Sequence, residues 1–216
     1  MKLSELFFIC DDAYGYQEVG HSVNYKFYEE DSNLIIFFQG SNSVFDWIRN
    51  FLFGKRPYKD MAIPYRVHRG FLAAWKEVED IIIEKISDPR WKDITVVGYS
   101  HGGSLCAFCT ECIWFYRPDL RENHMRGIAF ESPRILAQWA LPEELRVRWK
   151  NFTVVRVGND LVTHCPPIIF GYRHLGSMLK IKANTSSVSS WYIPHCIKCH
   201  YPQVVYQSLL DWESKE

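Results

Sequence analysis

Short runs of apolar, largely β-branched residues recur along this chain, and residues typical of turns close each run. Runs of this length are typical of strands that are buried on both faces of a sheet. The clearest are Leu34–Phe38, Ile94–Val97, Gly127–Phe130 and Phe152–Val157. Between them, Phe71–Ile86 and Ser104–Tyr116 carry apolar residues at helical spacing. Strands that alternate with helices predict an α/β fold with a mainly parallel central sheet.

Length and charge narrow the class of protein further. The chain has 216 residues, which suits one domain, expected here to span residues 1–216. Its 25 basic and 25 acidic residues cancel, which argues against electrostatic capture of nucleic acid or of an anionic membrane. Because no run of about 18 apolar residues is present, the sequence predicts no membrane span.

The cysteine count and the amino-terminal residues indicate the cellular compartment in which the protein is expected. Seven cysteines cannot all pair within the chain, and free thiols favour a reducing environment. The amino-terminal segment makes a poor secretion signal, because Glu5 interrupts a short apolar run that Asp11 and Asp12 then end. Together these features predict a cytoplasmic location, with secretion left open.

The sequence Gly98-Tyr-Ser-His-Gly102 fits the pattern G-x-S-x-G and lies between an expected strand and an expected helix. In that setting the serine occupies a sharp strand-to-helix turn, and the residues two positions before and after it are glycine because a Cβ there would clash. The turn raises the hydroxyl above the sheet and brings the first N–H groups of the helix under an oxyanion. Ser100 is therefore the candidate nucleophile, with a tight structural turn as the alternative.

A nucleophilic serine needs a base, and the base needs an acid that orients it. Asp160 is the favoured acid, because it follows the strand Phe152–Val157 as Ser100 follows its own strand; an ordinary turn aspartate is the alternative. The candidate bases are His164, His174, His195 and His200. His200 precedes Pro202, which suits the first turn of a last helix over 202–212, and this places His200 well to lean toward Ser100.

Further motifs accompany the serine motif. They are Phe38-Gln-Gly-Ser41 with Asp46-Trp47, Val67-His-Arg-Gly-Phe71, Ala129–Arg134, Arg156–Asp160 with Pro166-Pro167, and His200-Tyr-Pro with Tyr206. In this order they resemble the class 3 lipase family, the fungal-lipase-like branch of the α/β-hydrolases, over roughly residues 34 to 210. The resemblance implies an α/β-hydrolase fold with helices on both faces of the sheet. It also favours His200 over His195 through the Tyr206 spacing.

The resemblance implies that Ser100, Asp160 and His200 form a triad for hydrolysis of carboxylic esters, such as acylglycerols or other lipid esters, through an acyl-enzyme. It implies an oxyanion hole from Ser41 and the backbone N–H of His101. No cofactor and no metal are required. The expected partner is a lipid or small ester, met through transient contact with a lipid interface, and the sequence leaves the oligomeric state undetermined.

Two residues depart from the family pattern. Glu131 stands where the family usually has glycine, and we expect it to alter packing near the strand end. His101 stands where the family commonly has leucine, and its ring is expected either to touch the substrate or to point away. The apolar residues 44–53 are expected to form a lid or acyl-pocket wall, or else an ordinary packed helix.

Other functional classes stay open. His195-Cys-Ile-Lys-Cys-His200 offers zinc ligands or a Cys196–Cys199 disulfide or redox pair. Structural zinc sites usually join two separated half-sites, however, and the apolar helix with Cys106, Cys109 and Cys112 is better explained as core. The last alternative is a non-catalytic relative that acts as a binding protein.

Overall fold

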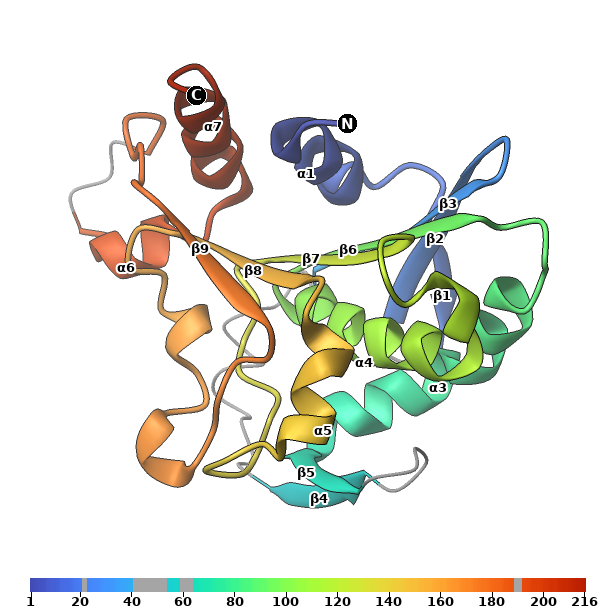
Figure 1. Ribbon diagram of the computed structural model, residues 1–216. Coiled ribbons are helices and arrows are strands. Elements are labelled where there is room, and N and C mark those ends of the chain that lie inside the picture. The colour runs from blue at the N-terminus through green and yellow to red at the C-terminus, as the bar shows by residue number, and fades with distance from the viewer. Residues whose placement is uncertain (21–22, 41–53, 59–63, 189–191) are drawn as a thin grey trace.

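The computed structural model describes residues 1–20, 23–40, 54–58, 64–188 and 192–216 (Figure 1). A seven-stranded sheet forms its centre, in the order β1-β2-β3-β6-β7-β8-β9. Its strands are β1 (Gln17–Val19), β2 (Val23–Glu30), β3 (Asn33–Phe38), β6 (Asp93–Tyr99), β7 (Met125–Phe130), β8 (Phe152–Val157) and β9 (Ser177–Ile181). From β3 to β9 neighbouring strands are parallel, whereas β1 and β2 extend the β3 edge antiparallel.

Helices lie on both faces of this sheet (Figure 1). One face carries α1 (Leu3–Asp11) and α7 (Pro202–Glu213); the other carries α3 (Arg69–Ile86), α4 (His101–Tyr116) and the short α5 (Glu143–Arg146). A two-stranded antiparallel sheet of β4 (Lys55–Tyr58) and β5 (Tyr65–His68) precedes α3, and α6 (His195–Lys198) precedes α7. The expected mainly parallel sheet with helices on both faces is therefore confirmed.

Apolar side chains fill both layers between helices and sheet. On the face of the sheet that carries α3, the apolar side chains predicted at helical spacing over Phe71–Ile86 are buried. There, Trp75 of α3 stacks on Phe108 of α4. On the opposite face, Phe7 of α1 packs edge-on against Tyr99 and Phe130, which belong to neighbouring strands. Because β6 and β7 contact helices on both faces, they need the continuous apolar runs from which the sequence predicted them.

A buried ion pair links α4 to the segment that precedes β8. Arg148 pairs with Glu111, whose side chain is fully buried, and the Tyr65 hydroxyl donates to the same carboxylate. Two donors around Glu111 satisfy a charge that would otherwise be costly to remove from water. This contact ties β5, α4 and the residues before β8 into one packed unit.

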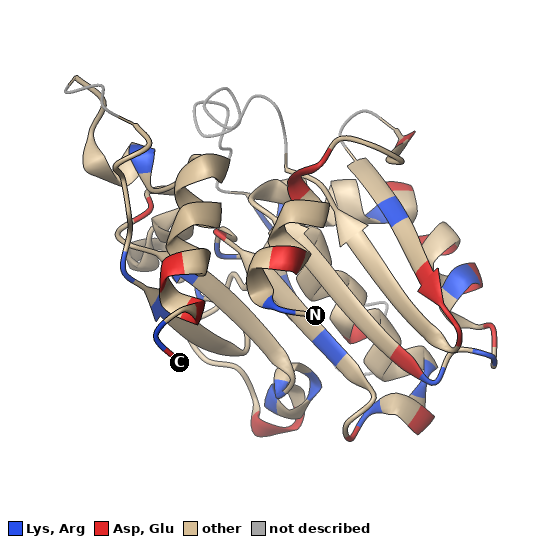
Figure 2. Cartoon of the chain, turned by 90° about the horizontal axis from the view of Figure 1, so that it is seen from above, with Lys and Arg blue, Asp and Glu red and all other residues tan. Residues whose placement is uncertain are grey.

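Charge is spread over the molecule without segregation of sign. Viewed from above, Lys and Arg lie interspersed with Asp and Glu along the strands and helices (Figure 2). Within the part of the chain that the structure describes, no helix is both long enough and apolar enough to cross a membrane.

The strand register aligns the ends at which the candidate residues lie. Gly98 of β6 pairs with Phe38 of β3 on one side and with Ala129 of β7 on the other. Parallel strands bring their carboxyl ends to one edge of a sheet, where open α/β folds bind ligands. The residues that follow β6, β7 and β8 therefore meet at this edge, although they are distant in sequence.

Candidate active site

Ser100 occupies the sharp turn between β6 and α4 that the sequence predicts. It has φ 54° and ψ −120°, a conformation that non-glycine residues rarely adopt, and it precedes the first residue of α4. The flanking glycines make room for this turn: a Cβ on Gly98 would lie 2.8 Å from the Gly103 nitrogen, and one on Gly103 would lie 2.7 Å from Ser132 Cβ. With Gly102, whose Cβ would meet the backbone at the end of β3, these glycines let the helix start against the strand ends.

A continuous hydrogen-bonded chain runs from Ser100 to Asp160. His200 Nε2 lies 3.0 Å from Ser100 Oγ, and His200 Nδ1 lies 2.8 Å from Asp160 Oδ2. All three side chains are buried, with Asp160 fully inaccessible. The remaining oxygen of Asp160 accepts the backbone N–H of Val162 at 3.0 Å, which fixes the orientation of the carboxylate toward the ring.

Tyr99 holds the segment that carries His200. Its hydroxyl donates to the His200 carbonyl oxygen, and its ring stacks on the imidazole with centroids 5.3 Å apart and planes inclined by 21°. Burial raises the pKa of the Tyr99 hydroxyl well above its ordinary value, so the group stays a neutral donor. Sequence reasoning missed this residue, although it lies next to the serine inside the motif.

The other candidate histidines have different partners. His164 Nδ1 lies 2.7 Å from the backbone oxygen of Asp160, and His174 Nε2 lies 2.8 Å from that of Thr163. His195, the rival to His200, lies 3.4 Å from Cys199 Sγ through its Nδ1. The structure therefore brings His200, the favoured histidine, to Ser100.

Of the two residues expected to form the oxyanion hole, only His101 lies among the residues that the structure describes. His101 begins α4, and N–H groups of a first helical turn point out of the helix end. Its ring is buried and lies against Phe71 with centroids 5.8 Å apart, and burial lowers the pKa of the imidazole to about 4. Ser41 lies outside the described residues, as do Asp46, Trp47 and the expected lid or pocket wall over 44–53.

Five of the seven cysteines are buried in the core. All seven are free, and Cys106, Cys109 and Cys112 are buried on α4, where Cys106 Sγ donates to the Val96 and Ile128 carbonyls. Cys196 and Cys199 form no disulfide. Among the described residues, the group whose atoms could surround a metal ion is Glu131, Asp160 and His200, which takes only His200 from the Cys/His segment 195–200.

Glu131 joins the site in a way that the sequence pattern did not indicate. It follows β7, is fully buried, and accepts the backbone N–H of Val157 on Oε1 at 2.5 Å. Its carboxyl group lies beside the carboxylate of Asp160 and the ring of His200, with the candidate ligand atoms of all three residues within 4.8 Å of one another. The glycine-to-glutamate departure thus places a second carboxyl group behind the Ser100–His200–Asp160 chain.

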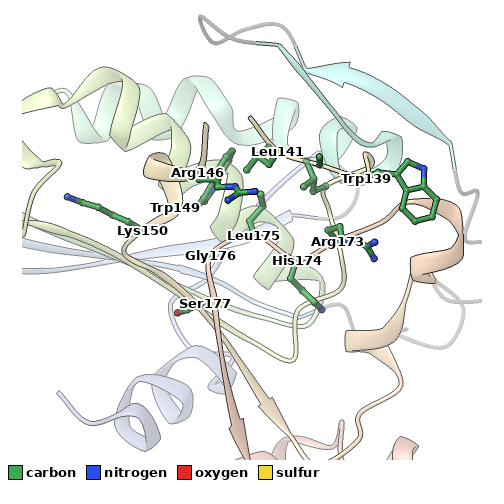
Figure 3. Close-up of a pocket in the computed structure, with 12 residues that line it drawn as sticks. Trp139, Leu141, Arg146, Trp149, Lys150, Arg173, His174, Leu175, Gly176 and Ser177 are labelled. Atoms are coloured by element: carbon green, nitrogen blue, oxygen red, sulfur yellow. The ribbon is translucent and has the colours of Figure 1, made fainter. Parts of the chain in front are cut away.

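A cavity of about 490 Å³ lies elsewhere, at the opposite ends of β8 and β9 (Figure 3). Trp149 and Lys150 line it just before β8, and Ser177 lines it at the start of β9. Figure 3 shows Trp139 and Arg173 at one side of the cavity, where the Arg173 guanidinium lies 5.3 Å from the Trp139 ring centroid. Because Asp160 follows β8, this cavity is remote from the hydrogen-bonded chain.

Comparison with known proteins relates the chain to lipases. It is 32% identical over 151 residues to a secreted mono- and diacylglycerol lipase of Fusarium solani, an alignment covering 65% of this chain and 41% of that protein. It is 26% identical over 168 residues to a lipase of Rhizomucor miehei, covering 73% of this chain and 44% of the other. The chain thus spans less than half the length of these relatives.

The fold is also that of solved lipases. The structure superimposes with a TM-score of 0.64 on a triacylglycerol lipase whose catalytic centre is formed by a serine protease triad. The match covers 77% of this chain and 66% of the other at 21% sequence identity, so it bears on fold. It confirms the expected α/β-hydrolase architecture.

The expectation of a cytoplasmic location is wrong. It is contradicted by the Fusarium solani relative, which is a secreted lipase. One ground for the expectation was the free cysteines, but five of the seven are buried. Burial raises the pKa of the Cys106 thiol far above its ordinary value. A buried neutral thiol is unreactive, so its free state does not indicate whether the surrounding compartment is reducing. The other ground was that the first residues make a poor secretion signal; these residues form helix α1, which packs against β6.

The motifs from which the resemblance was drawn now have places in the fold. Val67 and His68 end β5, and His68 Nδ1 accepts the Gly70 N–H at the start of α3. Ser100 and Asp160 follow β6 and β8, and His200 precedes α7. Residues 35–170 match the model of the family described as Lipase (class 3), which is more than half of the chain. The chain therefore belongs to the class 3 lipase family.

Proposed function

We propose that this chain hydrolyses carboxylic esters of lipids, with Ser100 as nucleophile, His200 as general base and Asp160 as the acid that orients His200. The observation that carries the proposal is the unbroken hydrogen-bonded chain from Ser100 Oγ through the His200 ring to Asp160 Oδ2. Its two distances are those of a base in contact with a nucleophile and of an acid in contact with a base. The class 3 lipase family to which the chain belongs adds support.

Acylation of Ser100 begins from the neutral imidazole. His200 Nδ1–H donates to Asp160, which leaves Nε2 to accept the serine proton. Ser100 Oγ attacks the ester carbonyl carbon while its proton passes to Nε2. The carbon–oxygen bond to the alcohol then breaks, the alcohol takes the proton from Nε2, and the acyl group stays on Ser100.

Deacylation repeats the same proton path with water. Nε2 of His200 takes a proton from water as the water oxygen attacks the acyl carbon, and Ser100 leaves with that proton while the carboxylic acid departs. In both halves negative charge develops on the carbonyl oxygen. The first proposed donor to this oxygen is the backbone N–H of His101, the first residue of α4, and the second is Ser41.

For the substrate we propose acylglycerols, met through transient contact with a lipid interface. The Fusarium solani relative acts on mono- and diacylglycerols by its name. The balanced charge of the chain suits an uncharged ester better than an anionic one. A series of esters of increasing acyl length, measured below and above the concentration at which each forms an interface, tests this part of the proposal.

Removal of the nucleophile is the primary test. Ser100→Ala is expected to abolish hydrolysis of p-nitrophenyl butyrate and labelling by a fluorophosphonate, while the circular dichroism spectrum stays that of the wild type. Mass spectrometry should locate the label on Ser100 in the wild-type protein. A folded Ser100→Ala variant with full activity would refute the nucleophile, and absence of labelling in the wild type would favour a non-catalytic binding protein.

Two histidine variants test the base. His200→Ala should lower kcat about 10⁴-fold or more, because the serine then has no acceptor for its proton. His195→Ala is the matched control, since His195 lies only five positions earlier and contacts Cys199 instead of Ser100; its kcat should stay close to that of the wild type. The reverse ranking of the two variants would move the base to His195.

A further inference from the structure

Glu131 holds an unusual position for a charged residue. Its φ is 48°, in the left-handed region that glycine occupies without penalty, and its side chain is completely buried. The class 3 pattern that this chain resembles commonly has glycine at this place. A strained backbone and a desolvated carboxyl group at the edge of a candidate active site together indicate a function for the side chain.

The two oxygens of Glu131 have different surroundings. Oε1 accepts the Val157 N–H at the end of β8, three residues before Asp160. Oε2 is buried and, within the described part of the chain, accepts no hydrogen bond. Buried polar atoms are nearly always satisfied, so an orphan oxygen here requires an explanation. Asp160 is the neighbour that supplies one, because its carboxyl oxygen lies in the same cluster.

A proton between the two carboxyl groups satisfies both. Two adjacent buried carboxylates cannot both stay ionised, because like charges repel strongly away from water. Asp160 already accepts the Val162 N–H and faces His200 Nδ1, whereas Glu131 accepts the Val157 N–H alone. The negative charge is thus better solvated on Asp160, and the proton belongs on Glu131.

The surroundings of Glu131 point the same way. The groups that face it from the packed elements are Asp160, His200, Tyr99 and Cys199. Burial, followed by the negative charge of Asp160, raises the pKa of Glu131 well above its ordinary value. The Tyr99 hydroxyl and the Cys199 thiol also have pKa values raised by burial, so they supply no negative charge that would favour a cation in place of this proton.

We propose that Glu131 is a positioning residue of the site: its carboxyl group stays protonated and Oε2–H donates to the carboxylate of Asp160. Together with the Val157 contact, this bond fixes Asp160 in the orientation that faces His200. The inference rests on the proposed function, since it extends the chain Ser100–His200–Asp160 by one member. Glu131 acts through Asp160 and does not itself contact the reacting ester.

Two substitutions separate this role from a structural one. Glu131→Gln keeps a neutral donor toward Asp160 and an acceptor for Val157, so kcat should stay within about threefold of the wild type. Glu131→Gly relieves the backbone strain at φ 48° and should fold, but it removes the donor. In that variant kcat should fall about tenfold or more with KM nearly unchanged, because only the alignment of the triad is lost.

The pH profile of kcat/KM decides whether Glu131 carries a charge. The acid limb reports protonation of His200 in the free enzyme. If Glu131 is neutral, Glu131→Gln leaves this limb in place, while Glu131→Gly moves it to higher pH because Asp160 loses a donor and holds the imidazolium more tightly. If Glu131 were ionised, Glu131→Gln would remove a negative charge near the ring and move the limb to lower pH by about one unit, which would overturn the proposal.

Two further measurements keep the result unambiguous. The fluorophosphonate label on Ser100 tests the proposed function separately: a labelled enzyme with wild-type kinetics in Glu131→Gly would sink the inference about Glu131 alone. Metal analysis of the purified protein tests whether a bound cation, instead of a proton, neutralises the carboxyl groups of Glu131 and Asp160. A stoichiometric divalent ion that is lost in Glu131→Gln would place a cation in this gap and overturn the proposal, whereas a metal-free active enzyme supports it.

Discussion

Gly102→Ala is a sharp test of how the serine turn is built. Gly102 is the second residue of α4, and its backbone is ordinary helix, so the substitution tests space and not conformational freedom. A Cβ at this position would lie 2.6 Å from the carbonyl carbon of Phe38, closer still to the carbonyl oxygen, and 2.7 Å from the Gln39 oxygen. These are backbone atoms at the end of β3, and they cannot rotate away as a side chain would.

The magnitude follows from that geometry. Ordinary contact begins near 3.4 Å, so the start of α4 must withdraw from β3 by about 1 Å. Overpacking of this kind costs about 1–3 kcal/mol, partly offset by about 1 kcal/mol from the better helix propensity of alanine. We expect a net loss of up to about 2 kcal/mol, which lowers Tm by up to about 8 °C in a protein of this size. Because Ser100 sits at the start of α4, a shift of about 1 Å should lower kcat about 100-fold.

The assay pairs thermal unfolding, followed by circular dichroism, with hydrolysis of p-nitrophenyl butyrate. Gly70→Ala is the matched control, because Gly70 lies in the first turn of α3 and is exposed, and its added Cβ would approach the His68 ring at 3.2 Å but no backbone atom. It should keep both Tm and kcat. If Gly102→Ala matched that control in both measurements, close packing of α4 on β3 would not be what forms the turn.

Two predictions concern stability. Burial lowers the pKa of His101 and of His174 to about 4 in the folded chain, so between pH 6.5 and 4 the unfolded chain binds protons that the folded chain does not. The contribution of each ring to stability should therefore fall by roughly 1.4 kcal/mol per pH unit as the pH drops from 6.5 to 4; in urea titrations His174→Gln should reduce the slope of stability against pH over this range by that amount, and an unchanged slope would contradict the assignment. Glu111→Gln should cost about 3–5 kcal/mol, because it leaves the buried Arg148 charge without its partner. In its control, Glu143→Gln, the lost ion pair with Arg146 is exposed and should cost less than about 1 kcal/mol; equal losses in the two variants would argue against the buried pair.

The local sequence pattern was sufficient to predict the central strands and the two long helices of the fold. The apolar runs that predicted strands are β3, β6, β7 and β8, and the two helical stripes are α3 and α4. Strands and helices that are buried along their whole length must be apolar at fixed periods, so they are readable without knowledge of their neighbours. The strands β1 and β2 were missed, because β1 is an edge strand and both sequences mix exposed with buried residues instead of forming an apolar run. That residues 1–216 form one domain stays a prediction.

The serine turn was likewise readable from local sequence, since its glycines and its position between strand and helix lie within a few residues. The choice among histidines was not, because His200 and His195 have the same local chemistry and differ only in what they meet across the fold. Tyr99 and Glu131 show the same limit. Both carry roles set by neighbours more than 25 residues away, His200 for the one and Val157 for the other.

The sequence by itself determined the α/β class, the serine turn and the order of the family motifs, because periodicity and turn chemistry are properties of adjacent residues. The tertiary structure decided which acid and which histidine approach Ser100. It did so because the parallel register brings the carboxyl ends of β6, β7 and β8 to one edge. The same packing buries Glu131 beside Asp160, where the proposed proton on Glu131 lets the two carboxyl groups remain together.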